Sequence, residues 1–149
     1  MTKQWGPPTW FFLHSFVEKI PESDYIELKD EMCKIILKIC HNLPCIECTK
    51  HAKLYTKNGL NSKTLDTKEK LRQYLFTFHD TVNIRLKKEK FTDYDKYKSA
   101  NLVLIYNHFK SHYLKYNDYK RGFIDTMVKN KILKMTDKFI IEHHKKFIN

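Results

Sequence analysis

Three features of this 149-residue sequence predict an all-α fold. Glycine and proline are scarce, with three and four copies, which favours helices joined by short connections. Apolar residues recur three and four positions apart along most of the chain, as they do on one face of a helix. Capping residues precede several of these runs. The length fits one domain, or one domain with an extension, and 42% hydrophobic residues are ample for a core.

The first predicted helix follows a turn at residues 5–9, where Thr9 is a candidate N-cap. Its apolar positions continue to Ile20, and Pro21 ends it. A second helix opens with capping-box spacing at residues 24–27, and its apolar positions run to Leu43. Cys33 and Cys40 lie on this helix, separated by about 10 Å of rise. Because a disulfide needs Cα atoms within about 7 Å, we expect two buried free thiols.

The third predicted helix begins at Cys45 and Cys48 and ends near Asn58-Gly59. Side chains three residues apart are neighbours on a helix, so these sulfurs can form a disulfide without backbone movement. A helix N-terminus also stabilises a thiolate and lowers the pKa of a cysteine placed there. Both properties indicate a pair that exchanges disulfides rather than a structural crosslink.

The fourth predicted helix is capped by residues 66–69, and its apolar positions run from Leu71 to Leu86. A second face carries His79 and Asn83 one turn apart, followed by three basic residues, Arg85, Lys87 and Lys88. This face suits a flat, aromatic and phosphorylated ligand, and a solvated helix face is the alternative. Segments 97–114, 119–135 and 137–148 are also predicted to be helical and contain no evident site.

The charge balance is strongly basic, with 28 Lys and Arg against 17 Asp and Glu and a net charge of +11. Such a chain attracts phosphates, acidic partners, nucleic acid or anionic membrane, although an evenly solvated lysine surface explains the spread equally well. There is no glycine-rich phosphate loop, so side chains and helix surfaces must hold any nucleotide. The apolar run at residues 10–17 is short and interrupted by His14, and no run approaches the roughly 20 residues that span a bilayer. We expect a soluble protein outside the general secretory route.

Three motifs occur in order: WGPPTWFFLH at residues 5–14, PCIEC at 44–48 and HDTVNIRLKK at 79–88. Together they resemble the Erv/ALR family of FAD-linked sulfhydryl oxidases, whose pattern reads WGxxxWxxLH, CxxC and HNxVNxxLxK. The resemblance covers about residues 4–91. It implies a four-helix bundle holding FAD in residues 1–91, with residues 92–149 as a helical C-terminal extension of unknown role. Asp80 replaces the usual Asn, and the second cysteine pair of longer relatives is absent, so the short viral members are most similar.

The resemblance also implies roles for individual residues. Cys45 and Cys48 are the expected catalytic pair, with Cys45 meeting the substrate and Cys48 facing the flavin. The expected cofactor-binding residues, carried over by position, are Gly6, Thr9, Trp10, His14, Cys48, His79, Val82, Asn83, Lys87 and Lys88. Which of the two lysines contacts the cofactor stays open, and no metal site is expected.

The implied activity is that of a FAD-dependent thiol oxidase that forms disulfides in a dithiol protein substrate. Electrons would pass through the cysteine pair and FAD to dioxygen, giving hydrogen peroxide. Without a second cysteine pair, the expected substrate is a small thioredoxin-like protein. A homodimer through the first helices is expected, and nucleic acid and a membrane span are not. The expected location is the host cytoplasm or virion if the chain is viral, and otherwise an oxidising compartment such as the mitochondrial intermembrane space.

Two other readings of the cysteine pair remain. In a structural zinc module of a basic nucleic-acid-binding protein, Cys45, Cys48 and His51 would be joined by His41 or His79. Three ligands within two helical turns do not match the usual geometry of such sites, however, and no second CxxC occurs. A flavin-free thioredoxin-like reductase would need strands that the sequence does not predict.

Overall fold

The computed structural model describes residues 4–116 and 122–148, and within these ranges the chain is all-α, as predicted. Seven α-helices are followed by one turn of 3₁₀ helix, η1 (His144–Lys146). The helices are α1 (Gly6–Glu18), α2 (Glu22–Cys40), α3 (Ile46–Thr56), α4 (Lys68–Arg85), α5 (Lys96–Ser99), α6 (Leu102–Lys115) and α7 (Gly122–His143).

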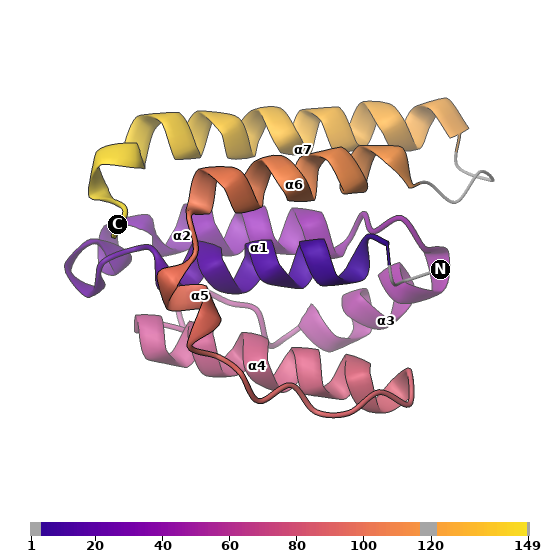
Figure 1. Cartoon of the computed structure of the whole chain (residues 1–149), viewed down its shortest axis with the longest axis horizontal. Coiled ribbons are helices and arrows are strands. Elements are labelled where there is room, and N and C mark those ends of the chain that lie inside the picture. The colour runs from indigo at the N-terminus through magenta and orange to yellow at the C-terminus, as the bar shows by residue number, and fades with distance from the viewer. Residues whose placement is uncertain (1–3, 117–121, 149) are drawn as a thin grey trace.

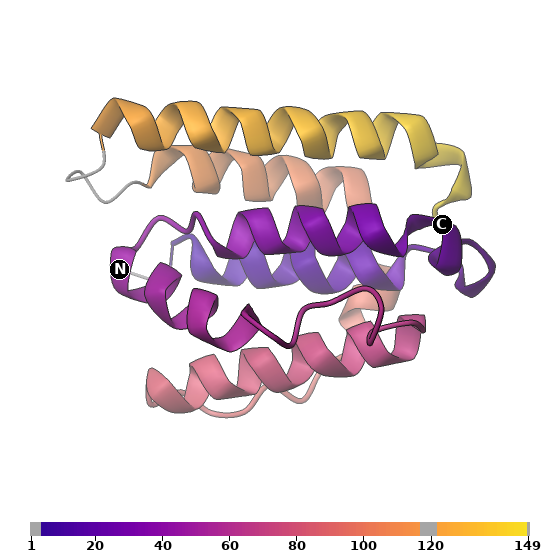
Figure 2. The ribbon, with the colours of Figure 1, turned by 180° about the vertical axis from the view of Figure 1, so that it is seen from behind.

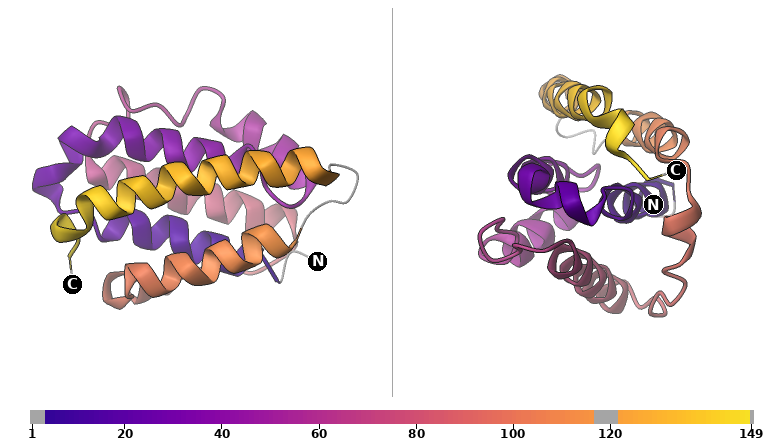
Figure 3. Two further views of the ribbon diagram at one scale, coloured as in Figure 1. Left: turned by 90° about the horizontal axis from the view of Figure 1, so that it is seen from above. Right: turned by 90° about the vertical axis from the view of Figure 1, so that its left-hand side faces the viewer.

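The long helices form three stacked layers of two (Figure 1). The middle layer contains α1 and α2, with α3 and α4 on one side and α6 and α7 on the other, as Figure 2 shows from behind. The end-on view in Figure 3 separates the pairs: α6 lies over α1, and α7 lies over α2. After α4 the chain runs back along that helix, and α5 leads it up to the outer layer (Figure 1).

The helix starts follow local chemistry, with two corrections to the expected caps. α2 begins at Glu22 with Pro21 as its N-cap, so the capping-box spacing at residues 24–27 lies inside the helix. α1 begins at Gly6 because prolines occupy its first turn, where a missing N–H costs nothing. Thr9 is therefore not the N-cap but lies within the helix, and its hydroxyl donates a hydrogen bond to the Trp5 carbonyl (2.7 Å). Thr67 caps α4 by accepting from the Lys70 N–H, as its position predicts.

The C-terminal helices differ from the expected segments. The predicted helix at residues 97–114 is divided into α5 and α6, because the Asn101 side chain accepts the Leu104 N–H and starts a new helix there. The two segments at 119–135 and 137–148 are one helix, α7, from Gly122 through Asp137 to His143. The predicted start at residue 119 lies outside the described residues.

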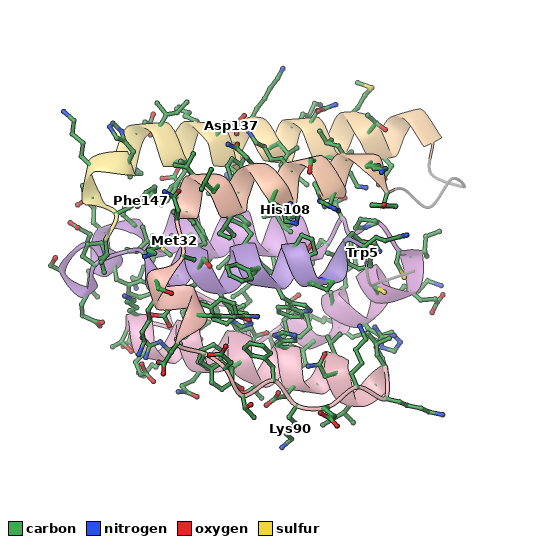
Figure 4. The ribbon with its side chains drawn as sticks, viewed as in Figure 1. Trp5, Met32, Lys90, His108, Asp137 and Phe147 are labelled. Atoms are coloured by element: carbon green, nitrogen blue, oxygen red, sulfur yellow. The ribbon has the colours of Figure 1, made fainter. Side chains whose placement is uncertain are left out.

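One hydrophobic core connects all three layers. Phe12 of α1 is fully buried and stacks on Phe109 of α6, with ring centroids 4.9 Å apart. Phe16 packs against Phe139 of α7 at 5.3 Å. Figure 4 shows side chains filling the spaces between the layers. Cys33 and Cys40 are buried free thiols, as expected.

A buried lysine joins the two outer helices. Lys129 of α7 has no exposed side-chain surface and forms an ion pair with Asp125 (3.3 Å). Its ammonium group also donates to the carbonyls of Tyr113 and Tyr116 at the end of α6, each at 3.0 Å. The lysine thereby gives hydrogen-bond donors to carbonyls at the C-terminal end of a helix and compensates for its own burial. Across the described part of the chain, no helix has the combined length and apolarity needed to cross a bilayer.

Candidate functional site

The cysteine pair lies where the chain enters α3. Cys45 is the N-cap residue, with extended backbone angles, and its sulfur accepts a hydrogen bond from the Cys48 N–H at 3.2 Å. The first N–H groups of a helix have no partner within the helix, so the sulfur of an N-cap residue can accept a hydrogen bond from one of them. Cys45 is partly exposed, whereas Cys48, in the first turn, is buried with 8% of its surface accessible. The pair therefore has one sulfur open to a partner and one directed into the protein.

The buried sulfur does not have the lowered pKa that its position at a helix start predicts. The pKa of Cys48 is raised to about 11, chiefly by burial and next by the interaction with Cys45. The Arg85 guanidinium favours the thiolate and acts in the opposite direction. Desolvation therefore outweighs the helix terminus at this sulfur, and Arg85 supplies the opposing charge.

Two histidines and a tryptophan form a stack between α1 and α4. The indole of Trp10 lies parallel to the His79 ring, with centroids 4.2 Å apart and 5° between the planes. His79 Nδ1 is 2.9 Å from His14 Nε2, so one proton is shared between two buried imidazoles. Burial, followed by the charges of Lys96 and Lys88, lowers the pKa of His79 to about 4. Burial and the neighbouring His79 also lower the pKa of His14, so both rings are neutral near pH 7.

The end of α4 turns the chain back over these rings. The Lys88 N–H donates to the Asn83 carbonyl (2.8 Å) and the Lys87 N–H to the Ile84 carbonyl (3.0 Å), the bond pattern of a Schellman motif. That motif needs a left-handed residue, and Lys87 supplies it with φ 57°. The Asn83 side chain donates to the Glu89 carbonyl (3.2 Å) and fixes the chain beyond the turn.

These elements enclose a cleft between α1, α3, α4 and the segment that follows α4. It contains about 1040 Å³ of empty space, including its open mouth. Eight of the expected cofactor-binding residues line it, namely Gly6, Thr9, Trp10, Cys48, His79, Val82, Asn83 and Lys88. His14 lies behind them, hydrogen-bonded to His79, and Lys87 is exposed and outside the lining. Of the two candidate lysines, Lys88 therefore lines the cleft and Lys87 does not.

Several lining residues were not predicted as site residues. Arg85 was noted only as part of a basic run, Phe91 was not singled out, and Lys96 and Tyr97 were assigned to the C-terminal extension. The Lys96 ammonium lies 4.3 Å from the Phe91 ring centroid and 5.0 Å from that of Phe11. The aromatic repeat of Phe91, Tyr94 and Tyr97 at three-residue spacing was the available signal, since it marks a segment with one packed side.

The structure does not bring together the residues that the zinc alternative would need as ligands. Among the side chains that the structure describes, no group of three or more His, Cys, Asp or Glu residues is arranged to hold a metal ion. His41 is hydrogen-bonded to the Thr56 hydroxyl (2.8 Å), and His79 to His14. His51 is exposed.

Comparison with known proteins agrees with this arrangement. The chain is 36% identical over 104 residues to a FAD-linked sulfhydryl oxidase of African swine fever virus (isolate Tick/Malawi/Lil 20-1/1983), which covers 69% of this chain and 84% of the viral protein. It is 29% identical over 89 residues to the mitochondrial FAD-linked sulfhydryl oxidase ERV1 of Saccharomyces cerevisiae, covering 60% of this chain and 46% of the yeast protein. No solved structure matches significantly. A family model described as the Erv1 / Alr family matches residues 7–101, well over half of the chain, and the chain belongs to that family.

Proposed function

We propose that this protein is a FAD-dependent thiol oxidase that forms disulfides in a dithiol protein substrate. The observation that carries the proposal is that Cys48 lines the same cleft as Trp10, His79, Asn83 and Lys88. A redox-active sulfur pair thus adjoins a cleft with flat rings and cationic side chains. The names of the viral and yeast relatives support the same activity.

The lining fits FAD in its chemistry. Flat rings, including Trp10, His79 and Phe91, can stack on aromatic parts of the cofactor. Lys88 and Lys96 carry positive charge for its diphosphate. Gly6, Thr9 and Val82 are further candidates from the same lining, and His14 would act through its hydrogen bond to His79.

The cysteine pair would work in its disulfide form as follows. A substrate thiolate attacks the Cys45 sulfur, the Cys45–Cys48 bond breaks, and Cys48 leaves as a thiolate with the bonding electron pair. The second substrate thiol then attacks the mixed disulfide, releasing oxidised substrate and the Cys45 thiolate. The exposure of Cys45 and the burial of Cys48 support this division of roles. When bound, FAD would accept two electrons from the reduced pair through Cys48, as the Cys45–Cys48 disulfide forms again, and would pass them to dioxygen to give hydrogen peroxide.

Three further proposals concern the substrate, the oligomeric state and the location of the protein. Cys33 and Cys40 are buried and provide no second shuttle pair, which favours a small thioredoxin-like protein as the dithiol substrate. We also propose a homodimer, as the family resemblance implies. Because α6 and α7 cover one side of α1 and α2, the dimer interface must use another face or require these helices to move. For location, we retain the host cytoplasm or virion, which the viral relatives favour.

Single cysteine substitutions test the proposed activity. We expect Cys45→Ala and Cys48→Ala each to abolish oxidation of dithiothreitol, measured as oxygen consumption, while bound flavin remains visible in the absorption spectrum. Cys33→Ala is the matched control, because it removes a thiol outside the cleft, and it should retain activity. Normal turnover in either variant of the pair would overturn the proposal.

A further inference from the structure

Arg85 is placed to act on the buried sulfur of the pair. It lies in the last turn of α4 and lines the cleft together with Cys48, and its guanidinium acts to lower the pKa of the Cys48 thiol. Across the described residues no carboxylate forms an ion pair with Arg85. The other arginine described on α4 behaves differently, since Arg72 pairs with both Glu18 (2.6 Å) and Glu69 (2.9 Å). The positive charge of Arg85 is therefore available to stabilise the Cys48 thiolate, whereas the charge of Arg72 is balanced by carboxylates.

The two sulfurs receive different stabilising groups. The Cys48 N–H donates its hydrogen bond to the Cys45 sulfur, so the amide of the first helical turn stabilises the more exposed cysteine. Cys48 is desolvated, which disfavours its thiolate, and the guanidinium is the group that opposes this effect. A charge-assisted hydrogen bond in a desolvated site is stronger than one in water.

Other charged and titratable groups also surround the cleft. Cys40 enters from α2, His79 from α4, Lys88 from the turn after α4, and Lys96 from α5. Burial keeps Cys40 as a neutral thiol, and His79 is neutral above about pH 4. The groups that act directly on Cys48 are Cys45 and Arg85.

We propose that Arg85 is a positioning residue that holds Cys48 as the leaving thiolate when the Cys45–Cys48 disulfide is attacked. In that step the substrate sulfur bonds to Cys45, the Cys45–Cys48 bond breaks, and the electron pair stays on Cys48 beside the guanidinium. A leaving thiol with a lower pKa leaves faster, so Arg85 directs attack toward Cys45 and away from Cys48. The role rests on the proposed thiol oxidase function, but the effect on the Cys48 thiol can be measured separately.

The test measures the pH dependence of Cys48 alkylation in full-length Cys45→Ser protein. Iodoacetamide is the probe, and mass spectrometry of the Cys48 peptide gives the rate, so Cys33 and Cys40 do not interfere. We expect Arg85→Met to shift the inflection of the pH–rate curve upward by about one unit or more, which is about tenfold slower alkylation at pH 8. Arg85→Lys should shift it less, because lysine keeps the charge without the planar fork. Lys53→Met, which removes an exposed charge from α3, is the matched control and should leave the curve unchanged.

The inflection reports the thiol pKa, whereas the plateau reports access, so a merely structural change moves only the plateau. An unchanged inflection in Arg85→Met would overturn the proposal. Circular dichroism checks the fold, and if Arg85→Met does not fold, an unchanged inflection in Arg85→Lys and Arg85→Gln would count against it equally. Failure of the thiol oxidase assignment would appear as normal turnover in Cys48→Ala, which is independent of this measurement.

Discussion

Two buried histidines make stability depend on pH at the scale of single residues. His79 has a pKa lowered from 6.5 to about 4, and the pKa of His14 is lowered as well. Between these pH values the unfolded chain binds protons that the folded chain does not, so folding weakens as the pH falls. We predict that the free energy of unfolding is flat above about pH 7 and decreases from pH 6.5 toward pH 4.

Urea denaturation at several pH values measures this dependence, which approaches a tenfold change in the folding constant per pH unit for one histidine. His79→Gln should flatten the curve, because the titrating group is removed. His108→Gln, at an exposed position of α6, should not. A stability that stays constant from pH 7 to pH 4 would contradict the buried, neutral pair.

Lys87 carries backbone strain that glycine would remove. Its φ of 57° lies in the left-handed region, which costs a residue with a Cβ atom about 1–2 kcal/mol. Part of the gain is lost because glycine gives the unfolded chain more freedom. We predict that Lys87→Gly stabilises the protein by about 0.5–1 kcal/mol in urea denaturation, while Lys87→Ala changes little. Destabilisation by glycine would show that the lysine side chain contributes more than its backbone costs.

Most of the site was visible in the sequence at this scale, and the missing parts have physical reasons. The spacing of Cys45 and Cys48 indicated a redox pair, and the family resemblance implied cofactor roles for Trp10 and His79, which line the cleft with Cys48. Lys88 could not be separated from Lys87, because the difference arises from one left-handed residue after α4. One cysteine of the pair was expected to have a lowered pKa, whereas the pKa of Cys48 is raised, because it depends chiefly on burial.

At the scale of elements, α6 is held on α1 by aromatic packing. Phe109 is fully buried and stacks on Phe12, at 4.9 Å and 15° between the planes. We predict that Phe109→Ala lowers the free energy of unfolding by about 3–5 kcal/mol, because it removes a large ring and leaves a cavity. Leu104→Ala is the control on the same helix, since Leu104 is 66% exposed, and it should change stability by about 0.5 kcal/mol or less. Equal effects of the two substitutions would contradict this packing.

The elements themselves were predictable where the caps and breakers are local. Thr67 marked the start of α4, and Pro21 separated α1 from α2. The division between α5 and α6 was missed, because apolar periodicity continues across the Asn101 cap. The continuity of α7 was missed for the opposite reason, since Asp137 interrupts the apolar pattern yet accepts the Tyr106 hydroxyl of α6 (2.7 Å). Figure 4 shows Asp137 on α7, above α6.

At the scale of the whole molecule, α6 and α7 form a layer that covers one side of α1 and α2. α6 and α7 pack on α1 and α2 through Phe12, Phe16 and their partners, on the side opposite α3 and α4. We predict that a chain ending at residue 101 exposes this apolar surface and self-associates or precipitates. Analytical ultracentrifugation of the truncated and full-length proteins measures the difference. If the truncated protein is monodisperse and has the same oligomeric state as the full-length protein, the layer of α6 and α7 is dispensable.

The boundary between the predicted core and the C-terminal extension does not coincide with the packing of the chain. The family model extends to residue 101, through α5, whereas the motifs visible in the sequence end at about residue 91. The segment between carries Phe91, Lys96 and Tyr97 into the cleft. Sequence motifs could not reveal this, because the segment reaches the site only by folding back along α4 (Figure 1).

The absorption spectrum of the purified full-length protein tests the central claim most directly, which is that the cleft beside Cys48 holds FAD. We predict a yellow protein with bound FAD whose flavin absorbance is bleached by dithiothreitol without oxygen in the wild type but not in Cys48→Ala. A colourless protein that takes up no added FAD, or flavin bleached equally in both proteins, would contradict the account.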